Sequence, residues 1–469
     1  MIRLRTPSPR LTATALVFAG LATATAGSPA GLRSINALTR DVATPVATSP
    51  VIRVGRPSAE IAVVQDVSAF SSSRSRRYSA EVVRTWHAVA AAQPTNPVRQ
   101  SRVLALVHAA MHDAVNGAVP RYERYASRLM DRTAHPEAAA AAAAYQVLLN
   151  LFPANATAFD VQLANSLDAI RDGAARDAGV ALGSAVGQFI VDIRANDGME
   201  VPDPFNPPPG PGIWAPTPPA FAPAVEPQMQ NVTPFSIRSR EQFEVEPPPS
   251  LFSEEYARDF DEVKTLGQDT SAVRNEDQTH YAHFWFEPSS VSWSRIAAIY
   301  TLQQRTGLHE TARLFALLNM AMADGYVAGF YWKRTHALWR PITAIRQADT
   351  DGNLSTEPDL TWNPLRPTPP SAEYPSTHAV LGSAAAQILR RFTGSDRFAF
   401  CMASSSSVPA GSARCYERFS EAAAENADSR VFIGYHFRFA TLAGMRLGRQ
   451  IGNFAFRHSL EPLRARHRQ

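Results

Sequence analysis

Three short stretches between residues 331 and 436 carry side chains that could bind and activate an oxyanion. They supply three fixed cations, hydroxyl groups, a candidate helix N-terminus and two imidazoles, on residues Lys333, Arg340, Ser376, Thr377, His378, Arg430 and His436. Cations and N–H groups neutralise the charge of a tetrahedral or trigonal oxyanion such as phosphate or vanadate. Imidazoles beside such an anion can move protons or act as nucleophiles.

The first stretch holds Lys333 and Arg340, which are seven residues apart and precede Pro341. On one helix this spacing places both cations on nearly the same face, two turns apart. A solvent-exposed face is the common fate of such a pair. The aromatic and apolar neighbours Trp332 and Trp339 favour burial instead, and a buried cation pair needs an anion.

The second stretch, Pro375–Ser376–Thr377–His378, precedes an apolar helix expected at 379–392. A helix start offers free backbone N–H groups and the positive end of the helix dipole, which together favour an anion. The alternative is a plain N-cap made by Ser376 or Thr377. Capping does not explain His378, because an imidazolium in the first turn opposes the dipole. An acid–base group next to an anion does explain it.

The third stretch runs from Ser429 and Arg430 to His436. A six-residue step leaves Arg430 and His436 about a third of a turn apart on a straight helix. The long Arg430 side chain, or a non-helical start, must close that gap. Alone, His436 would be interpreted as a structural histidine.

Taken together, the patterns Lys-x6-Arg-Pro, Pro-Ser-x-His and Ser-Arg-x5-His resemble those of the vanadium-dependent haloperoxidases and the related type 2 phosphatidic acid phosphatases. From about residue 79 onward the chain also resembles the bacterial haloperoxidase-like branch, as in 340–346 and 373–375. The resemblance implies an all-α fold of two packed helical bundles. The C-terminal bundle would carry the oxyanion site.

The resemblance also implies a role for each site residue. The equatorial oxygens of vanadate would be neutralised or hydrogen-bonded by Lys333, Arg340, Arg430, Ser376 and the backbone N–H of Thr377. His436 would be the axial ligand of vanadium, and His378 the acid–base group. With vanadate as the cofactor, the enzyme would use hydrogen peroxide and a halide or another small substrate.

Two other functions stay open for this pocket. An acid phosphatase would hold the phosphate of a phosphomonoester, with His436 phosphorylated and His378 protonating the leaving group. A non-catalytic oxyanion-binding protein is the third interpretation.

Two departures from the family pattern bear on the choice. Thr377 stands where glycine is usual and should narrow the pocket. Ala440 stands where an aspartate commonly orients the last histidine, so His436 needs another acceptor.

The elements that must position these residues are expected to be helices. Helical spacing of apolar residues predicts helices at 81–89, 102–115, 138–151, 158–171, 174–196, 252–266, 271–285, 291–306 and 309–339. No strand period or βαβ alternation is evident. We expect an N-terminal bundle at 79–200, a Pro-rich crossover at 201–250 and a C-terminal bundle at 251–469. The crossover either covers an opening near the site or only joins the bundles.

Other histidines allow further sites. His108 and His112, with Asp113, share a helix face and could bind a metal, but packing and hydrogen bonding are the simpler interpretation. His280 and His283, beside aromatic residues, could line a pocket, and core packing is again simpler.

The first residues of the chain indicate export, and export in turn allows the two cysteines to form a disulfide. Residues 1–26 have the basic start, the apolar run and the small-residue cleavage site of a signal peptide, and 27–78 should be a flexible leader with at most a short strand at 61–64. We expect no later stretch apolar enough to be a membrane helix, and a secreted or periplasmic protein, with a homodimer allowed. A bridge between Cys401 and Cys415 would then stabilise the fold by about 3 kcal/mol, and two free thiols are the alternative. The net charge of +4 gives no reason to expect a nucleic-acid partner.

Overall fold

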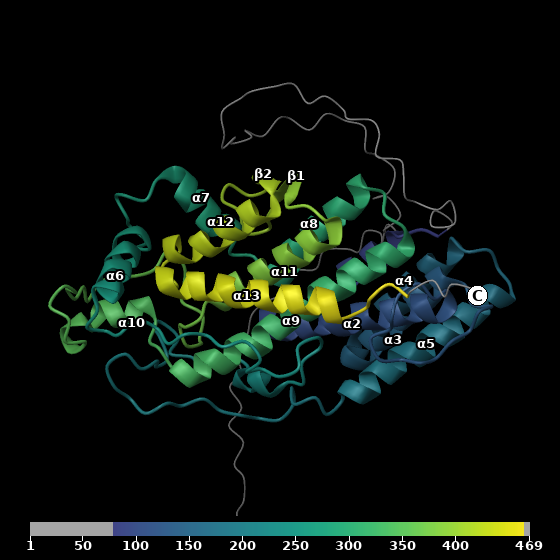
Figure 1. The fold of residues 1–469 in the computed structure, drawn as a ribbon, viewed down its shortest axis with the longest axis horizontal. Coiled ribbons are helices and arrows are strands. Elements are labelled where there is room, and N and C mark those ends of the chain that lie inside the picture. Colours follow the sequence, from purple (N-terminus) through teal and green to yellow (C-terminus); the bar gives the residue numbers. More distant parts are fainter. Residues whose placement is uncertain (1–77, 464–469) are drawn as a thin grey trace, which may run out of the picture. The chain divides into compact units, whose positions relative to one another are not determined.

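A computed structural model of the chain describes residues 78–463. The expected signal peptide, nearly all of the leader and the short strand at 61–64 lie outside these residues. The helices are α1 (Glu81–Ala91), α2 (Pro97–Ala118), α3 (Pro136–Leu151), η2 (Pro153–Asn155), α4 (Ala156–Asp168), α5 (Ala174–Arg194), η3 (Pro227–Asn231), α6 (Glu254–Leu266), α7 (Glu276–Phe284), α8 (Ser289–Gln303), α9 (Leu308–His336), α10 (Pro341–Arg346), η4 (Ala348–Thr350), α11 (Thr377–Thr393), α12 (Phe419–Phe432) and α13 (Arg438–His458). The all-α prediction is confirmed in its main point (Figure 1).

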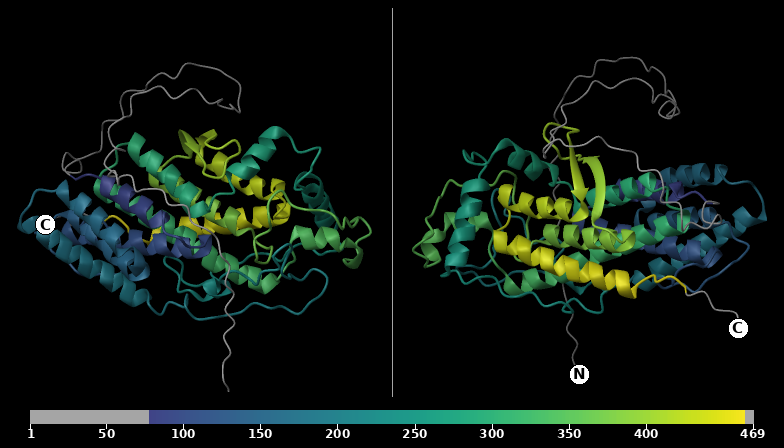
Figure 2. Two further views of the ribbon diagram at one scale, coloured as in Figure 1. Left: turned by 180° about the vertical axis from the view of Figure 1, so that it is seen from behind. Right: turned by 45° about the horizontal axis from the view of Figure 1, so that its top comes forward.

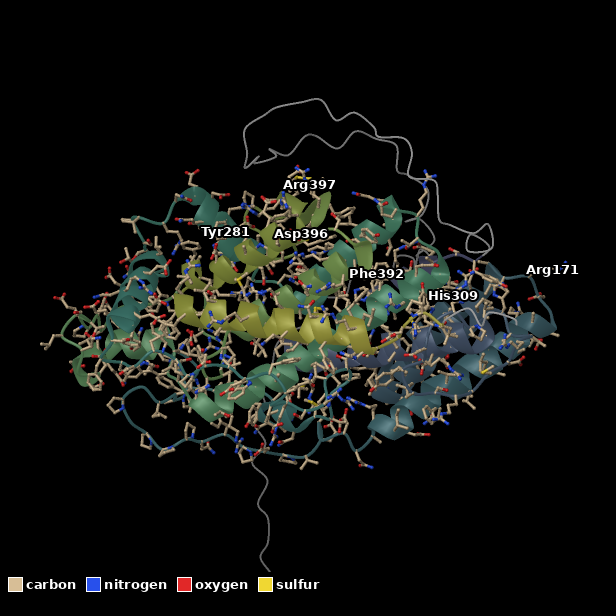
Figure 3. All side chains as sticks on the ribbon, viewed as in Figure 1. Arg171, Tyr281, His309, Phe392, Asp396 and Arg397 are labelled. Atoms are coloured by element: carbon tan, nitrogen blue, oxygen red, sulfur yellow. A yellow bond between two sulfur atoms is a disulfide. The ribbon has the colours of Figure 1, made fainter. Side chains whose placement is uncertain are left out.

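The helices form two groups that share one hydrophobic core. In the first group α2, α3 and α5 pack on one another, and in the second α11 packs on α9, α12 and α13. Helix α2 also packs along α9, so the two groups meet there (Figures 1 and 2). At that junction His309, labelled in Figure 3, donates a hydrogen bond of 2.8 Å to the carbonyl of Val119. The domain boundaries at 200 and 251 stay a prediction.

Small residues set the distance between helices within each group. In α5, Gly179, Gly183 and Gly187 recur every fourth residue, and a Cβ on any of them would lie within 2.8 Å of a backbone carbonyl oxygen of 135, 139 or 143. In α13, Gly444 and Gly448 approach the carbonyls of α11 and its N-cap in the same way. These pairs therefore contact backbone to backbone, as in other helix pairs with small residues at the interface.

Helix α9 is the central helix of the second group. It is long and apolar enough by composition to cross a membrane, and 89% of its most apolar window is buried inside the protein. The expectation that no later stretch has such a composition is therefore wrong. Burial against α2 and α11 explains the composition, because a helix that is hydrophobic all round can be the core helix of a large domain.

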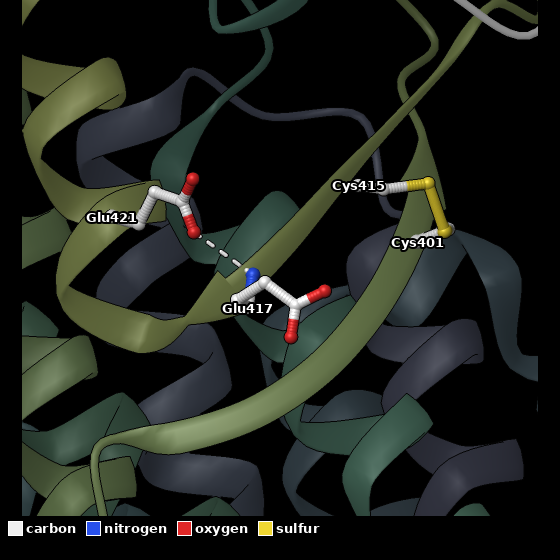
Figure 4. Close-up of a disulfide and its surroundings, with 4 residues drawn as sticks. All are labelled: Cys401, Cys415, Glu417 and Glu421. Carbon is white, nitrogen blue, oxygen red and sulfur yellow. Dashed lines mark hydrogen bonds between the residues drawn. A yellow bond between two sulfur atoms is a disulfide. The ribbon is translucent and has the colours of Figure 1, made fainter. Parts of the chain in front are cut away.

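A two-stranded antiparallel hairpin interrupts the helices, although no strand period was evident in the sequence. Strand β1 spans Arg397–Ala403 and β2 spans Ala413–Arg418, with Cys401 opposite Cys415. These two cysteines form a disulfide across the hairpin (Figure 4), which confirms the predicted bridge. The hairpin continues into α12, where the backbone N–H of Glu417 donates to the carboxylate of Glu421.

The Pro-rich crossover lies against α9 and the loop before α11. The buried carboxylate of Asp324 on α9 accepts the backbone N–H groups of Phe235, Ser236 and Ile237 at 2.6–3.0 Å. The N–H of Val225 donates to the carbonyl of Pro370 at 2.8 Å. Both contacts hold the crossover over the second group of helices, so it does more than join two bundles.

Candidate oxyanion site

One cavity of about 370 Å³ collects most of the predicted site residues, namely Arg340, Thr377, His378, Arg430 and His436. Lys333 lines a smaller adjoining cavity that shares Val225, Phe330 and Ser371 with the larger one. Ser376 is fully buried at the start of α11. The three stretches of sequence therefore meet at one place.

Lys333 and Arg340 reach the site from different elements, so their spacing does not place them on one helix, and the helix expected at 309–339 ends earlier, at His336. Helix α9 ends at His336 because Ala337 adopts a left-handed conformation with φ of 46°. Residues 338 and 339 then pair with the crossover, and Arg340 becomes the N-cap residue of α10. The turn brings Arg340 to the cavity while Lys333 approaches it from the last turn of α9.

Backbone carbonyls and neighbouring side chains fix both cations in place. The ammonium of Lys333 donates to the carbonyls of Ala372 at 2.5 Å and Glu373 at 2.8 Å. The guanidinium of Arg340 donates to the carbonyl and hydroxyl of Ser371 at 2.6 and 2.8 Å, and to the carbonyl of Tyr435 at 3.0 Å. Burial, and then the charge of Arg340, lowers the pKa of Lys333 well below its usual value. A bound anion would restore it.

Ser376 and Thr377 begin helix α11 in the manner predicted. Ser376 is the N-cap residue, but its hydroxyl makes no capping bond and has no partner among the residues that the structure describes. Its N–H donates to the carbonyl of Ala440 at 3.1 Å. The next N–H groups of α11 lack intrahelical acceptors, as at every helix start.

Thr377 lines the cavity but narrows it less than its branched side chain suggests. A Cβ on Gly329 of α9 would lie 2.7 Å from the Cγ2 methyl of Thr377. The methyl group therefore occupies the space that Gly329 leaves open, and it points at α9. A glycine on one helix accommodates the threonine that replaces the usual glycine on the other.

His378 is held by a hydroxyl group. Its Nδ1 lies 3.1 Å from the Oγ of Ser289 at the start of α8. Its Nε2 is buried and has no partner within residues 78–463. Burial, followed by the charge of Arg430, lowers the pKa of His378 well below its usual value. The imidazole is therefore neutral in the anion-free site.

A tight turn closes the gap between Arg430 and His436. Arg430 lies near the end of α12, Gly434 has φ of 83°, and the N–H groups of Tyr435 and His436 both donate to the carbonyl of Arg430. One guanidinium nitrogen of Arg430 donates to the carbonyl of Trp285 at 2.9 Å. Its Nε and other terminal nitrogen are buried without partners in the described part of the chain.

Glu373 orients His436, a role that sequence reasoning missed. The Nδ1 of His436 lies 2.9 Å from Oε1 of Glu373, and the N–H of Phe437 donates to the same oxygen at 3.0 Å. Burial is the main cause that raises the pKa of Glu373, to about 8. A proton on Oε2, which has no described partner, would leave Oε1 an acceptor. The Nδ1–H tautomer is thus favoured in either state, and Nε2 keeps its lone pair.

That carboxylate replaces the aspartate expected four residues after the last histidine. The backbone carbonyl of Ala440 accepts a hydrogen bond from the N–H of Ser376. The imidazole of His436 is instead hydrogen-bonded to Glu373, which lies 63 residues earlier in the chain. The Nε2 of His436 faces Arg340, 3.1 Å from a guanidinium nitrogen. Burial and then Arg340 lower the pKa of His436 well below its usual value.

The charges at the site call for an anion. The site holds three buried cations, Lys333, Arg340 and Arg430, and one buried carboxylate, Glu373, whose pKa Lys333 and Arg340 act to lower. Unpaired buried cations are strongly unfavourable, and here the unpartnered donors are Ser376 Oγ and two nitrogens of Arg430. Those donors and the Nε2 lone pair of His436 suit an oxyanion that accepts hydrogen bonds and takes an imidazole ligand. Vanadate has this chemistry, so the residues present fit it.

The remaining histidines pack elsewhere, as the simpler interpretation predicted. His108 lies 3.0 Å from His87, and His112 lies 2.9 Å from the carbonyl of Glu123. His280 and His283 contact the guanidinium groups of Arg414 and Arg366. In the described ranges, His, Cys, Asp and Glu side chains form no cluster of three that could hold a metal ion.

Comparisons with known proteins agree with this geometry. A family model described as the second helical-bundle domain of VCPO matches residues 313–465, the part that carries all seven predicted site residues. The vanadium chloroperoxidase of Curvularia inaequalis is 26% identical over 32% of this chain, and the match spans about a third of that protein's length (32%).

Two solved structures extend the likeness. The first bacterial vanadium-dependent iodoperoxidase superposes with a TM-score of 0.71 and 26% identity, over 82% of this chain and 97% of that one. A bacterial vanadium-dependent chloroperoxidase in its holo form gives 0.62 and 19%, over 79% and 97% of the chains, which shows a shared fold. In fold, site and domain match, the chain is thus similar to vanadium haloperoxidases, and the likeness to the family model covers residues 313–465.

Proposed function

We propose that this protein is an exported vanadium-dependent haloperoxidase, which uses bound vanadate and hydrogen peroxide to oxidise a halide. The observation that carries the proposal is the buried excess of cations around an imidazole whose Nε2 lone pair is kept available by Glu373. Export is proposed from the signal-like residues 1–26 alone.

In this proposal the vanadate oxygens would be held by two kinds of donor. Lys333, Arg340 and Arg430 would neutralise their charge, and the Ser376 hydroxyl and the Thr377 N–H would donate hydrogen bonds to them. His436 would be the ligand through Nε2. When bound, vanadate would supply a Lewis-acidic centre that activates peroxide toward halide.

The protein's own groups would transfer protons and stabilise the developing charge. The unpartnered Nε2 of neutral His378 would accept a proton from incoming peroxide and return it to the departing oxygen. Ser289 would hold the ring through Nδ1. Buried cations that keep one position need no reorganisation as charge develops, which is the main source of electrostatic catalysis.

Phosphomonoester hydrolysis is a second candidate, and one observation favours it. The hydrogen bond from His436 Nδ1 to a carboxylate is the arrangement that makes an imidazole nucleophilic. Phosphate would then occupy the place of vanadate, and His378 would protonate the leaving group.

Two assays on the purified protein separate these functions. Monochlorodimedone halogenation is measured with vanadate and peroxide over a range of pH, and p-nitrophenyl phosphate hydrolysis without them. We expect halogenation that is lost in His436→Ala and kept in the exposed control His458→Ala. Hydrolysis that vanadate inhibits, without halogenation at any pH, would establish the phosphatase. Vanadate binding without either activity would leave only an oxyanion-binding protein.

A further inference from the structure

A series of hydrogen bonds leads from the disulfide hairpin to the oxyanion site, and the proposed function makes no use of it. Helix α12, which carries Arg430, packs on α7 and on strand β2 (Figure 1). Trp285 directly follows α7 and is fully buried. Its backbone and its side chain contact two different residues of α12, so this one residue connects two parts of the same helix.

The backbone of Trp285 orients the guanidinium of Arg430. The carbonyl accepts a hydrogen bond of 2.9 Å from one terminal nitrogen, while Nε and the other terminal nitrogen have no partner within residues 78–463. The ring of Tyr435 lies 5.2 Å from the guanidinium carbon and offers no directional acceptor in its plane. The Trp285 carbonyl therefore decides where the two free nitrogens of Arg430 point.

The side chain of Trp285 is held by Glu425. The indole N–H donates to Oε1 of Glu425 at 2.9 Å. Glu425 and Arg430 both belong to α12, five residues apart. The contacts thus form a closed ring, in which Glu425 holds the indole and the carbonyl of the same tryptophan holds Arg430. Supporting hydrogen bonds of this kind fix the rotamer of a binding side chain before the ligand arrives.

The hairpin in turn holds Glu425. Arg414 on β2 donates to both carboxylate oxygens at 2.7 and 2.8 Å, and the hydroxyl of Tyr416 donates to Oε1 at 2.7 Å. These two residues flank Cys415, whose disulfide to Cys401 crosses the hairpin (Figure 4). With the indole, these groups donate four hydrogen bonds to the carboxylate, which is therefore fixed in one position.

The carbonyl of Trp285 also acts on His378. Burial and then the charge of Arg430 lower the pKa of His378, and a hydrogen bond to the backbone of Trp285 acts in the opposite direction. The acid–base group and the cation therefore depend on the same backbone acceptor. A shift of Trp285 would displace both.

We propose that Glu425 is a positioning residue for the oxyanion site, which acts through Trp285 to orient the two free nitrogens of Arg430 toward the anion. The inference rests on the oxyanion pocket of the proposed function and adds a residue outside its motifs. Glu425 lines neither cavity of the site, so it has no contact with the anion itself. A guanidinium binds an oxyanion through N–H groups in a fixed planar arrangement, so a misaligned Arg430 should bind it more weakly.

Calorimetric titration of the vanadate-free protein with inorganic phosphate tests this role. Trp285→Phe removes the indole N–H and keeps an aromatic ring, and Glu425→Ala removes its acceptor. We expect each to weaken phosphate binding about tenfold, as is typical when a partner that orients a ligand is lost. Both substitutions break the same hydrogen bond, so the double variant should bind phosphate about as well as either single variant. Glu425→Gln keeps an acceptor oxygen and should regain most of the affinity that Glu425→Ala loses.

Trp86→Phe is the matched control. Trp86 is also fully buried, and its indole N–H donates to Oγ of Ser166 at 3.2 Å, between helices α1 and α4. Both tryptophan variants should unfold at lower urea concentrations, but Trp86→Phe should keep the wild-type phosphate affinity.

Three results would overturn the inference. They are an unchanged phosphate affinity in Trp285→Phe, a loss in the double variant of about a hundredfold, which is the product of two separate effects, and no phosphate binding by the wild type. Phosphate binding needs neither vanadate nor peroxide. Wild-type halogenation, measured separately, therefore reports on the proposed haloperoxidase function alone.

Discussion

Glu373→Gln separates two effects of the buried carboxylate at the site, namely its hydrogen bond to His436 and its negative charge. Glutamine has nearly the same shape and keeps one oxygen that can accept from Nδ1 of His436 and from the N–H of Phe437, which lie 2.9 and 3.0 Å from the present oxygen. Because burial raises the pKa of Glu373 to about 8, the substitution removes a negative charge above pH 8, and the comparison is made there. The substitution should therefore weaken His436 as a ligand. At the same time it should strengthen the electrostatic attraction of Lys333, Arg340 and Arg430 for an anion.

The two effects have opposite signs, and the type of anion decides which one is seen. A hydrogen bond to a charged group contributes about 1.5–3 kcal/mol and one to a neutral group about 0.5–1.5 kcal/mol. Loss of the partner that orients a ligand typically lowers affinity by about 10–100-fold. Vanadate, which would be ligated by His436, should bind about 10-fold or more weakly. Phosphate, which depends on the cations alone for simple binding, should bind as well as before or more tightly.

Calorimetric titration of wild type and Glu373→Gln with each anion measures this difference directly. Glu246→Gln is the control, since only its backbone carbonyl, bound by the Tyr374 hydroxyl, approaches the same region. If vanadate and phosphate affinities change in parallel, then Glu373 acts only through charge. The proposed ligand role of His436 would then lose its support.

Three further perturbations follow from the structure. Gly329→Ala should destabilise the protein by about 1–3 kcal/mol in urea unfolding, because its Cβ would meet the Thr377 methyl at 2.7 Å, and Thr377→Ser should relieve most of that loss if this contact is the cause. Arg430→Met should make the anion-free protein more stable by about 1–4 kcal/mol while it abolishes stabilisation by vanadate; a loss of stability without the anion would show that the cation is already compensated. Burial lowers the pKa of His112 from 6.5 to about 4, so the folded state binds its proton less tightly than the unfolded state and stability should fall as pH drops from 6.5 to 4. His112→Gln should flatten that fall, whereas the exposed control His458→Gln should not.

The helices could be predicted from the sequence because their apolar spacing is local information. The end of α9 could not, since it depends on Ala337 in a left-handed conformation and on pairing of residues 338 and 339 with the crossover. The hairpin was missed because residues 398–403 of β1 are all apolar and show no alternation of polar and apolar side chains, and because the strands flank a Ser-rich loop. The disulfide was predictable, because Cys401 and Cys415 are the two cysteines of the chain.

The site residues were found through motif spacing, which records groups that contact the anion. Glu373 contacts the imidazole instead, and its partner is 63 residues away in sequence. Glu373 lies in the stretch 373–375 that resembles the family, but that resemblance assigned it no role. The absence of an aspartate at position 440 was a second signal, because it required that some other acceptor exist. The packing of the Thr377 methyl group against Gly329 could not be predicted either, because the two residues lie on different helices and far apart in sequence.

The close contact between α11 and α13 bears on how this protein can change over evolutionary time. Gly444 and Gly448 bring α13 to within contact of the carbonyls of Ser376 and Val380, so backbone shape positions the start of α11 without adjustable rotamers. Any larger residue there would displace the anion-binding N-terminus itself. The apolar residues that line the rest of the cavity, by contrast, come largely from the crossover and loops that stand apart from this contact. Selection can therefore change those loops while the start of α11 keeps its position.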